Sequence, residues 1–91
     1  MATTTIISHT VANFVQWKVA FDAGEAIRAQ SGITINGVYQ NVGNENEVTI
    51  IAEVSDIEVT KALFASPEFK ASMENGGVTS IPEVKILKLA F

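Results

Sequence analysis

The fold of this chain is decided by residues 38–54, which read VYQNVGNENEVTIIAEV. The turn-forming run Gly43–Asn46 separates two runs that are rich in β-branched side chains, a pattern typical of a β-hairpin. Alternate residues of the second run form an apolar set and a mixed set: Val48, Ile50, Ala52 and Val54, and Glu47, Thr49, Ile51 and Glu53. We therefore expect a central hairpin of Val38–Val42 and Glu47–Val54, whose second strand has one buried face and one face suited to a cleft wall.

A bend or bulge is expected just before this hairpin. Asn36-Gly37 is itself a hairpin signal, but a turn there would leave only the very short strands Ile33–Ile35 and Val38–Val42. Gly43–Asn46 is the better placed turn, so Asn36-Gly37 is predicted to be an irregularity within one strand.

The residues before the hairpin predict a strand followed by a helix. Thr3–Val11 is rich in Thr, Ile and Val, and its alternation places three residues on one side: Ile7, His9 and Val11. Asn13 is a helix cap, after which aromatic side chains recur at helical spacing: Phe14, Trp17 and Phe21. We expect one helix over Asn13–Ser31, with a kink at Gly24 and an end at Gly32, where glycine accepts a positive φ.

The residues after the hairpin predict a second helical region and a last strand. Asp56 caps a helix with an inward stripe made of Val59, Leu63 and Ala62. Ser66 caps a further short helix that begins with Pro67. Val84–Leu89 predicts a long strand at a sheet edge, because a proline stands before it and proline cannot donate to a neighbouring strand.

The predicted order is strand, helix, strand, strand, helix, strand, within a single domain that covers residues 1–91. This βαββαβ order is typical of a ferredoxin-like α+β fold, a four-stranded antiparallel sheet with two helices on one face. The other face carries Ile and Val from the first and third strands, which is too apolar for a sheet exposed to water. We therefore predict a homodimer in which two such faces pack together.

Composition excludes several classes of partner and site. Six Lys and Arg stand against ten Asp and Glu, giving a net charge of -4, so neither nucleic acid nor a membrane is expected as a partner. The absence of cysteine removes disulfides and thiolate metal sites. The sequence has no phosphate-binding loop, nucleophile elbow or metal-ligand spacing, so no cofactor and no metal are expected. No apolar run approaches the roughly 18 residues of a spanning helix, and a cytoplasmic location is the default expectation.

A series of short motifs along nearly the whole chain follows the order found in one known group of proteins. The motifs are His9-Thr10-Val11, Phe14, Trp17-Lys18, Phe21-Asp22, Arg28, Gly32, Gly37-Val38-Tyr39, Asn46-Glu47-Val48, Ser66-Pro67-Glu68, Met73, Gly77-Val78 and Pro82-Glu83-Val84. In this order the chain resembles the dimeric α+β barrel superfamily, and within it the small antibiotic-biosynthesis-monooxygenase-like proteins. The resemblance implies a ferredoxin-like protomer and a homodimer whose sheets form a barrel. It leaves the reaction open, since relatives include cofactor-independent oxygenases of aromatic polyketides, isomerases, cyclases and haem-handling proteins.

His9 is the candidate catalytic residue, because it is the only histidine of the chain. It lies between apolar neighbours on one side of a strand, where a pKa near neutrality suits a general acid or base. The alternative is a structural histidine that is hydrogen-bonded to a neighbouring group. Glu53 on an adjacent strand is a candidate to orient His9, and the alternative is a solvated charge at a strand end. Asp22 and Arg28 are predicted to make helix-surface or interface contacts.

Aromatic and polar residues are candidates for a ligand cleft. Trp17 and Phe21 are predicted either to line a pocket for an aromatic ligand or to belong to the core. Tyr39 is the second candidate catalytic residue, as a hydrogen-bond donor to an oxyanion, and Asn41 projects from the same face. The alternative for this pair is contact with water or with the partner subunit. Thr49 completes the candidate substrate-binding set.

The leading hypothesis for function is a homodimer with a small-ligand cleft in each protomer, acting as a cofactor-independent monooxygenase-like enzyme on a small, apolar or aromatic substrate. The substrate then supplies the electrons as a stabilised carbanion, and the protein desolvates, orients and deprotonates it. One alternative is a non-catalytic binding or sensing protein, favoured where the chain departs from its relatives, at Gly24 in place of a histidine and Gln40 in place of a basic residue. The other is a structural dimerisation module, which predicts a filled cleft.

Overall fold

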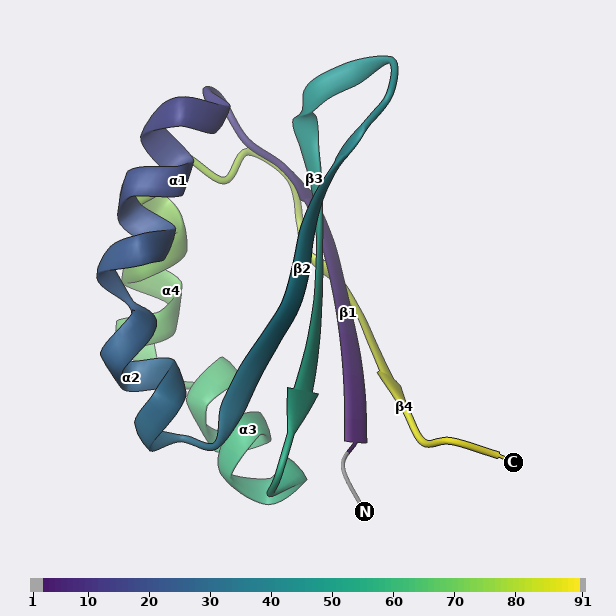
Figure 1. The fold of residues 1–91 in the computed structure, drawn as a ribbon. Coiled ribbons are helices and arrows are strands. Elements are labelled where there is room, and N and C mark those ends of the chain that lie inside the picture. The colour runs from purple at the N-terminus through teal and green to yellow at the C-terminus, as the bar shows by residue number, and fades with distance from the viewer. Residues whose placement is uncertain (1–2, 91) are drawn as a thin grey trace.

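The computed structural model describes residues 3–90 as one four-stranded sheet covered by helices. The elements follow the chain as β1 (Thr3–Thr10), α1 (Phe14–Ala23), α2 (Glu25–Gln30), β2 (Ile33–Asn41), β3 (Asn44–Val54), α3 (Ile57–Phe64), α4 (Pro67–Asn75) and β4 (Glu83–Leu87). Neighbouring strands are antiparallel in the order β2-β3-β1-β4. The helices form one layer on one face of this sheet (Figure 1). The predicted ferredoxin-like α+β fold is therefore confirmed.

The pair β1 and β3 forms the centre of the sheet. Their register places Ile7 opposite Ile50 and His9 opposite Val48. Because side chains alternate along a strand, one set from β3 points to the helices, and each member is at most 7% exposed: Val48, Ile50, Ala52 and Val54. The apolar face predicted for this strand is thus the face that the helices cover.

β2 is one continuous strand with a bulge, as the Asn36-Gly37 pair predicted. Ile35 and Gly37 pair with consecutive residues of β3, so Asn36 has no partner across the ladder. The extra residue allows Ile35 and Val38, three positions apart, both to pack against the buried core.

The hairpin turn is shorter than predicted. β3 begins at Asn44 rather than at Glu47, because Val42 and Gly43 alone make the turn. The Asn41 side chain stabilises this tight connection, since its Oδ1 accepts a hydrogen bond from the Gly43 N–H at 2.8 Å.

Side-chain caps and glycines set the helix ends where the sequence predicted them. The side chains of Asn13, Asp56 and Ser66 each accept a hydrogen bond from a backbone N–H in the first turn of α1, α3 and α4. Gly24 does more than kink the first helical region, because it separates α1 from α2. Gly32, with a φ of 73°, ends α2 and turns the chain into β2.

The inward face of α3 differs from the predicted stripe. Val59 is 45% exposed and Ala62 is also exposed, whereas Thr60 is fully buried. Thr60 tolerates burial because its hydroxyl donates a hydrogen bond to the Asp56 carbonyl oxygen at 3.2 Å. Of the predicted stripe only Leu63 is partly buried.

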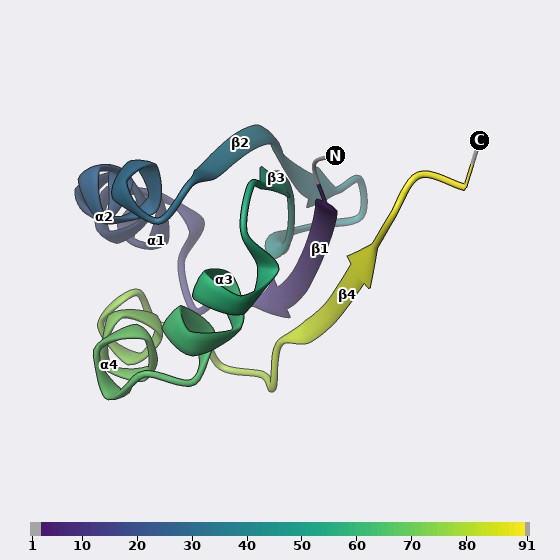
Figure 2. The same cartoon turned by 90° about the horizontal axis from the view of Figure 1, so that it is seen from below.

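β4 is an edge strand, as predicted, and pairs only with β1. It ends at Leu87 rather than at Leu89, since Leu87 already lies opposite Thr4 near the start of β1. It is far from α1 and α2 (Figure 2). Val84 and Ile86 lie on the helix side of the sheet, yet they remain 42% and 43% exposed because no helix covers them.

Replacing Gly32 with alanine should lower the free energy of unfolding by about 1–3 kcal/mol. An alanine would have to adopt the positive φ, and its Cβ would overlap the Ser55 Oγ. Urea unfolding measures the loss, with Gly43→Ala as the control. An added Cβ at Gly43 meets only the Asn41 Oδ1, at 3.5 Å, so that variant should stay within about 0.5 kcal/mol of the parent.

The double variant G32A/S55A separates the two causes of the Gly32 effect. It should recover the part of the loss that comes from the overlap with Ser55 and retain the part that comes from the backbone. Equal stabilities of G32A and G43A would contradict this account of the turn.

Candidate functional site

A cavity of about 160 Å³ lies between the helical layer and the covered face of the sheet. Most of its wall is apolar or aromatic: Ile7, Trp17, Ala20, Phe21, Ile27, Ile33, Ile35, Ile50, Ala52, Leu63, Phe64, Phe69 and Met73. The polar side chains of the wall are few: Thr5, His9, Arg28, Glu68 and Ser72. An apolar enclosure with a small number of polar groups is the usual construction of a small-molecule site.

His9 stands in the wall of this cavity. β1 holds it on the covered face, and its side chain is only 6% exposed. The Nδ1 atom is buried and has no hydrogen-bond partner among residues 3–90. Burial lowers the pKa of His9 below its ordinary value of 6.5, so the imidazole is neutral at pH 7. The alternative was a structural histidine with its polar atoms hydrogen-bonded to neighbours. His9 differs from it, because its Nδ1 has no such partner among residues 3–90.

Trp17 and Phe21 line the same cavity from α1. Trp17 is 4% exposed and its ring lies edge-on to His9, with centroids 5.7 Å apart. Phe21 stacks on Trp17, with the ring centroids 4.8 Å apart. Their spacing of four residues brings them together on one helix face. These rings belong to the core and also form part of the cavity wall.

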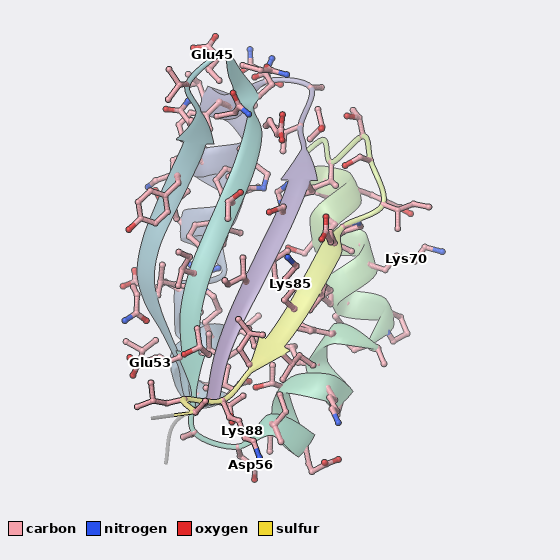
Figure 3. All side chains as sticks on the ribbon, turned by 90° about the vertical axis from the view of Figure 1, so that its right-hand side faces the viewer. Glu45, Glu53, Asp56, Lys70, Lys85 and Lys88 are labelled. Carbon is pink, nitrogen blue, oxygen red and sulfur yellow. The ribbon has the colours of Figure 1, made fainter. Side chains whose placement is uncertain are left out.

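Tyr39, Thr49 and Glu53 lie on the opposite face of the sheet, which Figure 3 shows with Glu53 labelled. Tyr39 is 56% exposed. The Thr49 Oγ1 is 2.9 Å from the Oγ of Ser8, and the Glu53 Oε1 accepts a hydrogen bond from the Asn36 side chain at 3.3 Å.

The expectation that Glu53 lies beside His9 is wrong. The register pairs Glu53 with Thr4, an outward residue, while the residue opposite His9 is Val48. A shift of the register by one residue moves every side chain of a strand to the other face of the sheet. The predicted ends of the two strands were not exact enough to fix this register. Tyr39 is likewise absent from the cavity wall, so it cannot donate to an oxyanion there.

Asn41 lies at the hairpin end rather than at the cavity. Its Nδ2 donates a hydrogen bond to the Glu47 Oε2 at 3.4 Å, and its Oδ1 closes the turn. The structure thus gives Asn41 a role in the hairpin, and it groups only His9, Trp17 and Phe21 of the predicted site residues.

Arg28 is a site residue that the sequence analysis missed. It was predicted at a surface or interface, yet it lines the cavity with its Cζ 3.9 Å from the centroid of the Phe21 ring. A signal was present, since Arg28 follows Phe21 by seven residues and so falls on the same face of the single helix predicted over Asn13–Ser31. Asp22 does lie on the surface, where it forms an ion pair with Lys18 at 2.7 Å.

The described residues contain no group of three His, Asp or Glu side chains placed to hold a metal ion. In the same part of the chain, no helix has the length and apolarity needed to cross a membrane.

Solved structures with this fold include proteins of the group suggested by the motifs. SnoaB, a cofactor-independent oxygenase from Streptomyces nogalater, matches with a TM-score of 0.77 and 17% identity over 99% of this chain and 94% of that one. An antibiotic biosynthesis monooxygenase matches with a TM-score of 0.73 and 11% identity over 97% and 98%. A conserved protein from Methanosarcina mazei Go1 matches with a TM-score of 0.62 and 17% identity over 97% and 92%.

These likenesses concern the fold. No protein-family model and no curated protein matches the sequence. At 11–17% identity a shared backbone does not carry an activity with it. The chain therefore has the fold of the antibiotic-biosynthesis-monooxygenase-like proteins, as its motifs predicted.

Proposed function

We propose that this protein is a homodimer that takes up a small apolar or aromatic substrate in the cavity of each protomer and oxygenates it without a cofactor. His9 is the general base of this reaction. The observation that carries the proposal is the buried, unpartnered Nδ1 of a neutral histidine in the wall of an apolar cavity.

The size of the cavity supports a single-ring ligand. Engineered apolar cavities of about 150 Å³ bind benzene, and the cavity beside His9 measures about 160 Å³. Trp17 and Phe21 line the cavity and give such a ring aromatic side chains to pack against. A purely structural module would have filled this space with side chains, so the cavity argues against that alternative.

The chemistry follows from the state of His9. A neutral imidazole accepts a proton, whereas an imidazolium cannot. A phenol or a 1,3-dicarbonyl compound that gives its proton to His9 becomes a stabilised anion, and a carbon of this anion adds to O₂ to form a peroxide. The peroxide takes the proton back from His9, and the resulting hydroperoxide then loses water, which leaves one oxygen atom on the substrate as a carbonyl group. The wall around the anion is largely apolar, and the fold that this chain shares with a cofactor-independent oxygenase is consistent with such a reaction.

Dimerisation would cover the sheet face that the helices leave open. Ile6 and Ile51 lie opposite each other at the centre of that face, and Tyr39 extends over Gly37 beside them. Water contact of this apolar surface is unfavourable, so a second copy is its natural cover. In this proposal Tyr39 and Thr49 act at the interface rather than in catalysis.

A binding protein without chemistry is the second candidate. It is favoured by the separation of Glu53 from His9, which leaves the imidazole without a carboxylate to orient it. Ligand uptake without O₂ consumption would identify this function.

Replacing His9 with glutamine should lower the rate of O₂ consumption by about 100- to 10,000-fold, the usual contribution of a general base. The assay is an oxygen electrode with a panel of monocyclic phenols and 1,3-dicarbonyl compounds. Lys70→Gln is the control, because Lys70 is exposed on α4 and does not line the cavity, and its rate should stay near that of the parent. Unchanged turnover in H9Q would remove His9 from the mechanism.

Stability should fall on acidification more steeply in the parent than in H9Q. The folded state holds the pKa of His9 below 6.5, so as the pH falls below this value the unfolded chain takes up the proton first. The loss of stability begins near the unfolded pKa and is complete once the pH has passed the folded one. Urea unfolding at pH 7 and pH 5 measures it, and an NMR titration of the single histidine gives the folded pKa directly. A folded pKa at or above 6.5 would contradict the burial argument.

Replacing Ile51 with lysine should raise the dimer dissociation constant by more than about 100-fold, because it buries two like charges at the centre of the interface. Sedimentation velocity over a concentration series measures the constant. Val19→Lys is the control, since Val19 is 69% exposed on α1 and lies on the other side of the molecule from that face. A parent protein that is folded and monomeric at micromolar concentration would refute the dimer.

A further inference from the structure

Among residues 3–90, Arg28 is the only cationic side chain that lines the cavity. It reaches the wall by folding back along the helix, where Gly24 leaves room for it: a Cβ on Gly24 would stand 3.0 Å from one terminal nitrogen of the guanidinium. A larger side chain at position 24 would therefore push the guanidinium out of its present place.

The position of Arg28 leaves its hydrogen-bond donors available. Its Cζ lies over the Phe21 ring, 3.9 Å from the centroid, so the guanidinium packs against an aromatic ring. The five N–H donors of arginine point outward in the plane of the group and suit the two oxygens of a carboxylate. The ion pairs of residues 3–90 all use lysine: Lys18 with Asp22, Lys61 with Glu58, and Lys85 with Glu83.

The charges around Arg28 do not neutralise it by contact. Asp22 is engaged by Lys18, and Glu25 lies on the first turn of α2 beyond ion-pair distance from Arg28. Glu68 lines the same cavity from α4 and is exposed to solvent. It forms no ion pair with Arg28 among the described residues. The largely apolar wall strengthens any charge-assisted hydrogen bond that the guanidinium forms with a ligand.

We propose that Arg28 is the anion-binding residue of the cavity and that the preferred ligand is a monocyclic aromatic carboxylate. This inference rests on the proposed ligand-binding function of the cavity. The ring of the ligand packs against Trp17 and Phe21, and its carboxylate accepts two hydrogen bonds from the guanidinium. Arg28 contacts Phe21, Phe21 stacks on Trp17, and Trp17 contacts His9. The part of the ligand that Arg28 anchors is therefore not the part that reacts at His9.

Binding of benzoate and of uncharged benzamide tests the proposal. The two probes have nearly the same shape, and Trp17, the single tryptophan of the chain, reports binding by its fluorescence. Arg28→Gln should weaken benzoate binding by about 10- to 100-fold and leave benzamide binding within about twofold. Lys61→Gln is the matched control, since it removes one positive charge from an exposed position on α3 that does not line the cavity, and it should leave both affinities unchanged.

Two further measurements keep the test independent of one variant. Arg28→Lys retains the charge but loses the planar fork, so its loss of benzoate affinity should lie between those of the parent and R28Q. In the parent, added salt should weaken benzoate binding and spare benzamide binding.

The outcomes separate this inference from the proposed function. Benzamide binding with no preference for benzoate, or an equal effect of R28Q on both probes, would overturn the role of Arg28 and leave the cavity as a ligand site. Failure of both probes to bind the parent protein would overturn the role of Arg28 and the ligand-binding function together.

Discussion

The antiparallel register between β1 and β3 is the constraint on which the rest of the structure depends. By placing His9 opposite Val48, it sends the histidine to the face that the helices cover. The same register sends Ile6 and Ile51 to the other face. A shift of one residue would exchange the two faces, so that the histidine would meet solvent and the core would lose its apolar residues. The backbone hydrogen bonds between β1 and β3 therefore determine which residues line the cavity and which lie on the open face of the sheet.

The second organising feature is a row of rings and charges along α1 and α2. His9 meets the edge of Trp17, Trp17 stacks on Phe21, and Phe21 lies under Arg28. Helical spacing brings Trp17 and Phe21 together on α1, the space beside Gly24 lets Arg28 of α2 reach the Phe21 ring, and β1 supplies His9. A neutral base, His9, thus stands at one end of the row and a cation, Arg28, at the other. Such an arrangement suits a ligand whose two ends differ chemically.

Local signals in the sequence predicted the elements well, because caps, glycines and alternation act within a few residues. Gly24, Gly32 and the Asn36 bulge all lie where the sequence placed them. Relations across the sheet were harder. Glu53 lies on the predicted face of its own strand, but His9 was expected on that face too, because the register of two strands about forty residues apart is not written in either of them. The burial of Thr60 was missed because a hydropathy pattern treats its hydroxyl as polar. That hydroxyl can nevertheless be buried, since it donates a hydrogen bond to the Asp56 carbonyl oxygen one turn earlier. Arg28 was missed for a related reason, since a charged residue is ordinarily assigned to the surface.

The bulge at Asn36 has a consequence for how sequences of this fold compare. Because Asn36 has no partner in the ladder, removing it would leave Ile35 and Val38 on the same face, now in regular alternation. The strand can thus gain or lose one residue during evolution without altering which side chains meet the core. Such a length change shifts any linear alignment by one position along the rest of the chain. Backbones that superimpose can then show little residue-by-residue agreement, even where the packing inside them has been kept.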